Sequence, residues 1–487
     1  MTRPPFGFGP ADRPDDEPGP GGNDPFGLGG LLGAGGGDVA GMFASMQRLM
    51  SWTGGPVNWD LATEVATTAT REGDRPVTAA EAEQVAEACR LADLWLDGVT
   101  GLPAVGGTAQ AWTRTGWVED TLPAWRQLVD PVAGRVVQAM TDTLKKGLTD
   151  GLAGQGGELQ LPEGLPPEMA GMLSGMLGGG GLADALGPLA GVMEQVGGFV
   201  FGAQVGQALG ALAAEVLGGT ETGLPLARTG RPALVPANVE AFSAGLEVPV
   251  DEVRLYLALR EVAHARLFAA VPWLQAHLFD AVDAYARGIE VDPAAIERAV
   301  GSVDPTDPES LQRAVGEGLF DLPPTPAQQA ALNRLETALA LVEGWVDAVV
   351  DAAASGPLPS AAALRETLRR RRASGGPAEQ TFTALVGLQL RPRRLRDAAA
   401  LWGALAARGG AEARDALWEH PDLLPSAADL DDPVGFAHGD RSAAASDDVG
   451  EQGFDWDAGL RDLDKDLDGD LDDDAGGGPE EPPAPTG

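Results

Sequence analysis

One stretch of the chain, residues 248–268, constrains the fold most, because it reads as a long helix that buries charged side chains. Pro249 and Asp251 stand where a helix begins, and the helical pattern continues until Pro272. At 100° per residue the apolar side chains gather on one face, and these are Val253, Tyr256, Leu257, Leu267 and Phe268. The opposite arc, which we expect to face outward, carries Arg254, Ala258 and Ala265.

Polar groups interrupt the apolar face of this helix. Arg260 falls at about 340° and His264 at about 20° from Val253, and Glu261 lies at the edge near 80°. An unpaired buried charge is very costly, so these side chains must have partners. A structural interpretation therefore places Arg260 and Glu261 in an ion-pair network and makes His264 a hydrogen-bonded core histidine.

A second interpretation starts from the order Arg260-Glu261-x-x-His264, which is H-E-x-x-H with its first histidine replaced. In the full motif two histidines on one helix face bind zinc, and the glutamate polarises a metal-bound water. Glu261 and His264 can fill the base position and one ligand position. Arg260 cannot be a ligand, because a guanidinium stays protonated and has no free lone pair.

Several segments beyond the motif resemble a bacterial family of zincin-like hydrolases, described as zinc-dependent metalloproteases. The motif helix continues into Arg266-Leu267-Phe268 and Val271-Pro272-Trp273-Leu274. The resemblance spans roughly residues 40–420 and includes four further segments, which are Phe199 with Gly202, Gly206 and Gly210, residues 232–238, residues 369–382 and residues 391–393. One branch of the family is associated with biosynthesis of a deazaflavin coenzyme.

The resemblance implies a zincin-like fold, a zinc cofactor, a peptide or protein substrate, Glu261 as general base and His264 as metal ligand. Further ligands stay open, with Asp283 and Glu290 among the carboxylates that follow the motif. The alternative function is that of a catalytically inactive scaffold or interaction protein. Arg260 favours this alternative, because its fixed positive charge opposes a neighbouring dication.

The charge of the chain argues against two kinds of partner. Its 487 residues carry a formal net charge of −38, which repels nucleic acid and anionic membrane surfaces. Residues 426–487 contribute 19 acidic and 3 basic side chains, and residues 1–38 contribute 6 and 2. The one basic run, Arg369 to Arg372, is predicted to pair with carboxylates of the body, with a phosphate site as the alternative.

Helical spacing and the family resemblance predict one mainly α-helical, zincin-like domain with little strand, and composition predicts disordered termini. We expect a disordered Gly/Pro-rich lead over residues 1–38, a zincin-like helical domain over 39–425 and a disordered acidic tail over 426–487. Cys89 is the single cysteine, which fits a reducing cytoplasm. It shares a helical stripe with Val85, Ala92 and Leu96 and is predicted to fill the core.

Three local patterns add to this picture. Residues 196–214 lack charge but are short and only modestly apolar, so we predict a buried helix and not a membrane span. Its glycines at 198, 202, 206 and 210 predict close approach of a neighbour, which we expect to be the motif helix. Thr78 and Glu81 form a capping-box pattern, and Pro232 and Pro236 confine the extended residues between them to an edge or loop.

Overall fold

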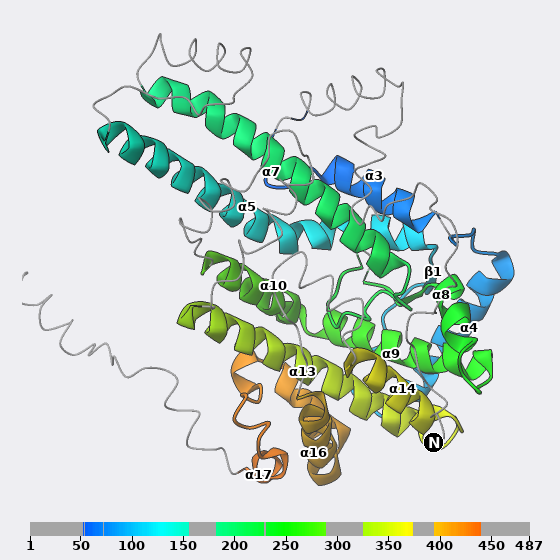
Figure 1. Cartoon of the computed structure of the whole chain (residues 1–487). Helices are drawn as coiled ribbons and strands as arrows, with labels where there is room; N and C mark the ends of the chain where they lie inside the picture. Colours follow the sequence, from blue (N-terminus) through cyan, green and yellow to red (C-terminus); the bar gives the residue numbers. More distant parts are fainter. Residues whose placement is uncertain are drawn as a thin grey trace, which may run out of the picture.

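Helices make up nearly all the regular structure of the protein in the computed structural model (Figure 1). The structure describes residues 52, 54–71, 73–154, 182–227, 230–288, 325–373 and 394–439. In chain order the elements are α3 Trp59–Thr70, α4 Ala79–Leu96, β1 Gln110–Ala111, α5 Arg114–Gly154, α7 Leu182–Ala213, β2 Ala233–Leu234, α8 Pro236–Ser243, α9 Val250–Ala270, α10 Pro272–Arg287, α13 Pro326–Ala354, α14 Ala361–Ala373, α16 Leu395–Asp415, the 3₁₀ turns η1 Ala416–Trp418 and η2 Pro421–Leu423, and α17 Pro433–His438. The predicted mainly α fold class is confirmed.

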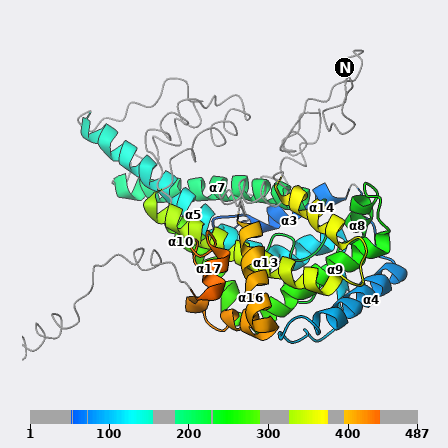
Figure 2. The same cartoon turned by 90° about the horizontal axis from the view of Figure 1, so that it is seen from below.

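The helices form layers around α9. The helices α3, α5 and α7 pack together on one side, and α10 joins this group to α13 (Figure 1). The helix α13 in turn contacts α14 and α16, and α17 packs on α16. The view from below shows α9 between α4 and α13 (Figure 2). The middle of the motif helix therefore lies at the centre of the molecule, and its first turn reaches the surface, where Val250 is 40% exposed.

A two-stranded parallel sheet lies beside this central helix. Residue Gln110 pairs with Ala233, and Ala111 pairs with Leu234. Leu234 also forms an antiparallel bridge to Gly218. The prolines Pro232 and Pro236 end the second strand, because proline cannot donate to a ladder. The strand β2 also contacts α9. The sheet therefore holds the loop that begins at Gly218 beside this helix.

The glycine stripe of α7 lets another helix approach closely, but the neighbour is α3 and not α9. A methyl group at Gly202 would lie 2.6 Å from the carbonyl oxygen of Asn58, and one at Gly206 would lie 2.6 Å from that of Ala62. The predicted close approach is thus confirmed, and the predicted partner is wrong. The identity of the partner depends on how the chain folds back over α7, which the spacing of the glycines does not encode.

The helix α9 is covered on every side from Tyr256 to Leu267. Ala258 and Ala265, which were expected to face outward, have relative exposures of 0% and 5%. The helix α4 packs on α9, and its own buried stripe contains Cys89. Burial and the nearby charges of Glu261 and Asp93 raise the pKa of the Cys89 thiol to about 12. The prediction that Cys89 fills the core is confirmed.

The folded body extends beyond the boundary at residue 425 that composition predicts. Residues 426–439 include Leu430 and, on α17, Phe436, and both side chains are buried against the core. The prediction rested on the acidic composition of this stretch and gave no weight to its two buried apolar residues, Leu430 and Phe436. The predicted lead at 1–38, residues 440–487 of the tail, Glu290, and the family segments after Ala373 up to residue 393 lie outside the described residues. None of the helices in the described ranges is long and apolar enough to span a membrane.

Candidate functional site

The sequence places Arg260, Glu261 and His264 on the most buried part of α9. This helix begins at Val250 after Pro249, has Asp251 and Glu252 in its first turn, and ends at Ala270. Acidic side chains in a first turn complement the positive end of the helix dipole. The three motif side chains then enter a space enclosed by α13, α14 and the loop after Gly218. All three residues are at most 7% exposed.

Arg260 bridges two carboxylates on α13. Its Nη2 donates to Glu343 Oε2 at 2.6 Å, and its Nη1 donates to Asp347 Oδ1. Burial lowers the pKa of Arg260, but the charges of Asp347 and Glu343 outweigh burial and raise it above its usual value. Glu343 and Asp347 are one helical turn apart, so one guanidinium reaches both. Arg260 is therefore locked in an ion-pair network, as the structural interpretation predicts.

Two arginines of α14 complete this network. Arg369 Nε donates to Asp347 Oδ2 at 2.9 Å, and Arg372 Nη1 donates to Glu343 Oε2. Burial would raise the pKa of Glu343, but Arg372, His264 and Arg260 lower it far below its usual range. We name the five residues Arg260, Glu343, Asp347, Arg369 and Arg372 the ionic core. It ties α9, α13 and α14 together.

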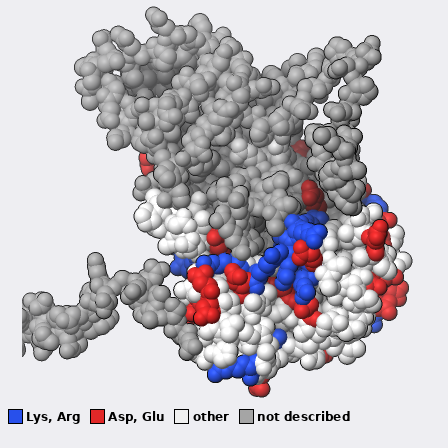
Figure 3. Space-filling model, turned by 60° about the horizontal axis from the view of Figure 1, so that its bottom comes forward, with Lys and Arg blue, Asp and Glu red and all other residues white. Residues whose placement is uncertain are grey.

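The basic run of α14 pairs with carboxylates, as predicted. Besides the two arginines of the ionic core, Arg370 contacts Glu366 and Arg371 contacts Glu221. The surface in Figure 3 shows the same mixture, with Lys and Arg side chains gathered beside Asp and Glu. Because each of the four arginines has a carboxylate partner, these contacts do not support the alternative prediction of a phosphate site.

His264 is a hydrogen-bonded core histidine. Its Nδ1 lies 2.8 Å from the carbonyl oxygen of Arg260, and its Nε2 lies 3.2 Å from Glu343 Oε1. A carbonyl oxygen can only accept, so Nδ1 carries a proton in this arrangement. Nε2 is then left to face a carboxylate that two arginines also contact. The side chain of His264 is 2% exposed.

Glu261 does not join the ionic core, contrary to the structural interpretation of the sequence. Its Oε2 accepts from Gly219 N at 3.1 Å, and its Oε1 accepts from Thr220 N at 3.1 Å and from Thr220 Oγ1 at 2.8 Å. Burial raises the pKa of Glu261 above its usual value, and the nearby His264 and the bonds from Thr220 and Gly219 oppose this. The carboxylate thus fastens the loop to α9.

A small cavity lies between these groups. Its volume is about 20 Å³, and its wall includes Arg260, Glu261, His264, Leu234 and Arg372. A polar cavity of this size holds about one water molecule. The two candidate residues of the motif therefore line one small cavity, whose volume is too small for a substrate.

The carboxylates Glu343 and Asp347 were not predicted from the sequence. They stand four apart in the otherwise apolar run from Leu339 to Val350, and two charges on one face of such a helix signal a buried partner. That signal marks the two positions but does not identify Arg260, which lies 83 and 87 residues earlier in the chain.

Residues 57–437 match the model of a family described as "Zincin-like metallopeptidase". The chain belongs to this family. A comparison with proteins of curated function gives no match.

A solved structure of similar extent also aligns with this zincin-like protein. It is "a putative hydrolase with a novel fold" from Chloroflexus aurantiacus, with 21% sequence identity and a TM-score of 0.48. The alignment covers 80% of the present chain and 100% of the other.

Membership of the zincin-like family implies zinc, but the side chains around α9 do not fit this ion. Arg260 stands in the first histidine position, and a guanidinium cannot donate a lone pair. Glu343, the carboxylate nearest to His264 Nε2, already binds Arg260 and Arg372. Within the described ranges, no three His, Cys, Asp or Glu side chains are grouped to hold a metal ion. Asp283, one candidate third ligand, instead pairs with Arg287 on α10.

Proposed function

We propose that this zincin-like protein is a catalytically inactive scaffold that acts by binding, with α9 as a structural centre. The observation that carries the proposal is the position of Arg260. Its guanidinium takes the place of the motif's first histidine and is bound on both sides by Glu343 and Asp347.

Electrostatics support this function over zinc-dependent hydrolysis. A dication on His264 would lie close to the fixed charges of Arg260 and Arg372. The same two arginines satisfy Glu343, so recruiting Glu343 to a metal would leave buried guanidinium groups without their partner. Breaking such a buried pair is expected to cost about 3–5 kcal/mol.

Metal analysis of the purified protein tests the proposal. Protein prepared without added metal or chelator is measured by inductively coupled plasma mass spectrometry beside His264→Ala. We expect no stoichiometric zinc in either protein. About one zinc per chain that disappears in His264→Ala would overturn the scaffold and establish a variant zinc site.

A zinc-dependent hydrolase is the second candidate, with Glu261 as general base and His264 as a metal ligand. The observation that favours it is that both side chains line one cavity of about 20 Å³, which can hold one water molecule between them. A peptidase screen with Glu261→Gln and His264→Ala separates the candidates, because hydrolysis lost in both variants would support the hydrolase. Hydrolysis that persists in both variants would show that Glu261 and His264 do not catalyse it.

A further inference from the structure

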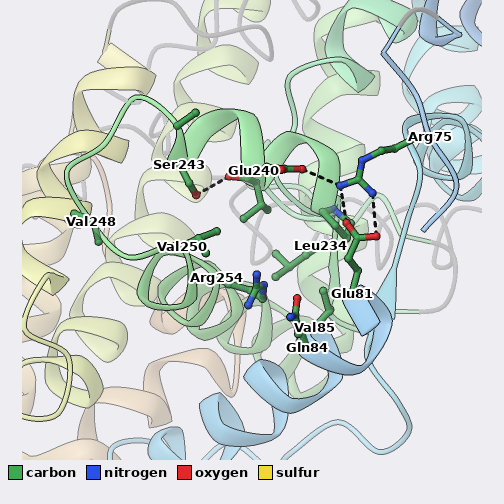
Figure 4. Close-up of a pocket in the computed structure, with 13 residues that line it drawn as sticks. Arg75, Glu81, Gln84, Val85, Leu234, Glu240, Ser243, Val248, Val250 and Arg254 are labelled. Carbon is green, nitrogen blue, oxygen red and sulfur yellow. Dashed lines mark hydrogen bonds and ion pairs between the residues drawn. The ribbon is translucent and has the colours of Figure 1, made fainter. Parts of the chain in front are cut away.

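A second pocket lies on the other side of Leu234 from the cavity at Glu261. Its volume is about 490 Å³, which is in the range of small-molecule sites. It is bounded by the start of α4, the strand β2, the helix α8 and the start of α9 (Figure 4). The apolar part of its wall includes Val85, Leu234, Val239 and Val248.

One rim of the pocket is held by a charged triad. Arg75 binds Glu81 through both carboxylate oxygens, at 2.9 and 2.6 Å, and also contacts Glu240 Oε2 at 2.9 Å. Two carboxylates therefore share one guanidinium, which leaves an excess negative charge at the rim. The side chain of Glu240 is 71% exposed, so this negative charge is accessible to a ligand.

The opposite wall carries a positive group. Arg254 is 17% exposed, and its Nη1 donates to Asp251 Oδ1 at 2.6 Å. Asp251 is 82% exposed, and a pair with such an exposed partner contributes little. Of the five N–H groups of Arg254, one is used in this contact. Figure 4 shows the Arg254 guanidinium across the pocket from Glu240, with Leu234 nearby.

We propose that this pocket binds a zwitterion with an aliphatic side chain, either a free amino acid or a short peptide. Arg254 receives the carboxylate, Glu240 receives the ammonium group, and the aliphatic side chain lies against Leu234 and Val239. A simple anion would meet the excess negative charge at the rim, and a simple cation would meet Arg254. A ligand with both charges and an apolar part matches all three surfaces.

The pocket gives a binding protein a ligand site that is separate from the ionic core, and the first turns of α9 contribute Val250 and Arg254 to its wall. Leu234 lines both this pocket and the cavity at Glu261. The site is nevertheless complete without any change at the ionic core. The inference goes beyond the proposed function and stands whether or not His264 binds a metal.

Isothermal titration calorimetry of the full chain with four probes tests the inference. The probes are L-leucine, L-leucyl-L-leucine, N-acetyl-L-leucine, which lacks the ammonium group, and L-leucinamide, which lacks the carboxylate. We expect at least one zwitterion to bind with a Kd below about 1 mM, and its single-charge analogue to bind about tenfold more weakly or worse. The better of the first two probes distinguishes an amino-acid site from a peptide site.

Two variants locate the binding. Arg254→Gln should weaken the zwitterion about tenfold and leave L-leucinamide unchanged, and Glu240→Gln should weaken it similarly and leave N-acetyl-L-leucine unchanged. Arg287→Gln is the matched control, because Arg287 forms a similar helical ion pair with Asp283 on α10, outside the pocket. Thermal melting checks that each variant is folded.

Three outcomes would overturn the inference. These are no binding of either zwitterion at about 10 mM, equal binding of N-acetyl-L-leucine or L-leucinamide and the zwitterion, and equal binding by the control and both pocket variants. Metal content at α9 affects none of these readouts, so failure here is distinct from failure of the scaffold proposal.

Discussion

At the scale of single residues, Glu343 is the carboxylate that connects two arginines to His264. It accepts from Arg260 and Arg372 and lies 3.2 Å from His264 Nε2. A buried carboxylate is stable only when paired, and here two guanidinium groups supply the pairing. Glu343 thereby joins Arg260 of α9 to Arg372 of α14.

Replacing Arg260 by methionine should destabilise the protein by about 3–5 kcal/mol, because Glu343 and Asp347 each lose a buried partner. Urea unfolding followed by tryptophan fluorescence measures the loss. Arg370→Gln is the control, since Arg370 is 76% exposed and pairs with Glu366 at the surface. We expect that variant to stay within about 0.5 kcal/mol of the wild type. Equal effects of the two substitutions would contradict the role of the ionic core.

The lowered pKa of Glu343 predicts a specific pH dependence. A carboxyl whose folded pKa lies below its unfolded value of about 4.3 stabilises the fold above that pH, and the contribution is lost as the pH falls below it. The difference in free energy of unfolding between wild type and Glu343→Gln should therefore shrink by about 1.4 kcal/mol per pH unit below about pH 4. Urea titrations at pH 6, 4 and 3 measure it.

Asp283→Asn removes a surface carboxylate from α10 and controls for a general loss of charge. A difference between wild type and Glu343→Gln that is constant from pH 6 to pH 3 would show that Glu343 is not stabilised as an anion.

At the scale of elements, the contact between α7 and α3 shows how a sequence pattern can be right about geometry and wrong about the partner. The glycines of α7 meet the backbone of α3 and of Asn58 just before it. A small-residue stripe requires only that some backbone comes close. Which backbone does so is decided by packing of the whole layer.

Gly202→Ala should destabilise the protein by about 1–3 kcal/mol, because the added methyl group meets the carbonyl oxygen of Asn58. Gly403→Ala on α16 is the matched control. A Cβ at Gly403 meets nothing within 4 Å, so helix propensity alone should stabilise that variant by up to about 1 kcal/mol. Thermal and urea unfolding should give opposite signs for the two substitutions. The same sign for both would refute the tight α3–α7 contact.

At the scale of the whole molecule, α17 shows that the folded body includes residues beyond the predicted boundary at 425. It packs on α16 and buries Phe436 at 8% exposure. Two apolar side chains in an acidic stretch are a weak compositional signal, but burial of one large aromatic ring contributes substantially to stability.

Phe436→Ala should therefore lower the free energy of unfolding by about 3 kcal/mol. Val434→Ala, on the same short helix, is the control, because Val434 is 59% exposed. Urea unfolding should show at most a small change for the control. An equally small change for Phe436→Ala would mean that α17 does not contribute to the body.

The sequence by itself determined the features that depend on neighbours within a few residues. These include the limits of α9, the buried stripe of α4 with Cys89, the capping box at Thr78 and the need of Arg260 for a partner. Each follows from helical periodicity or backbone hydrogen bonding, which are local. Only the tertiary structure decided that the partners of Arg260 are Glu343 and Asp347, that Glu261 holds the loop at Gly219, and that α3 covers the glycines of α7. These pairings join residues far apart in the chain. Burial requires that every charge has a partner and that every interior surface is closely packed, but the partner and the packing neighbour are chosen by the folding of the whole molecule.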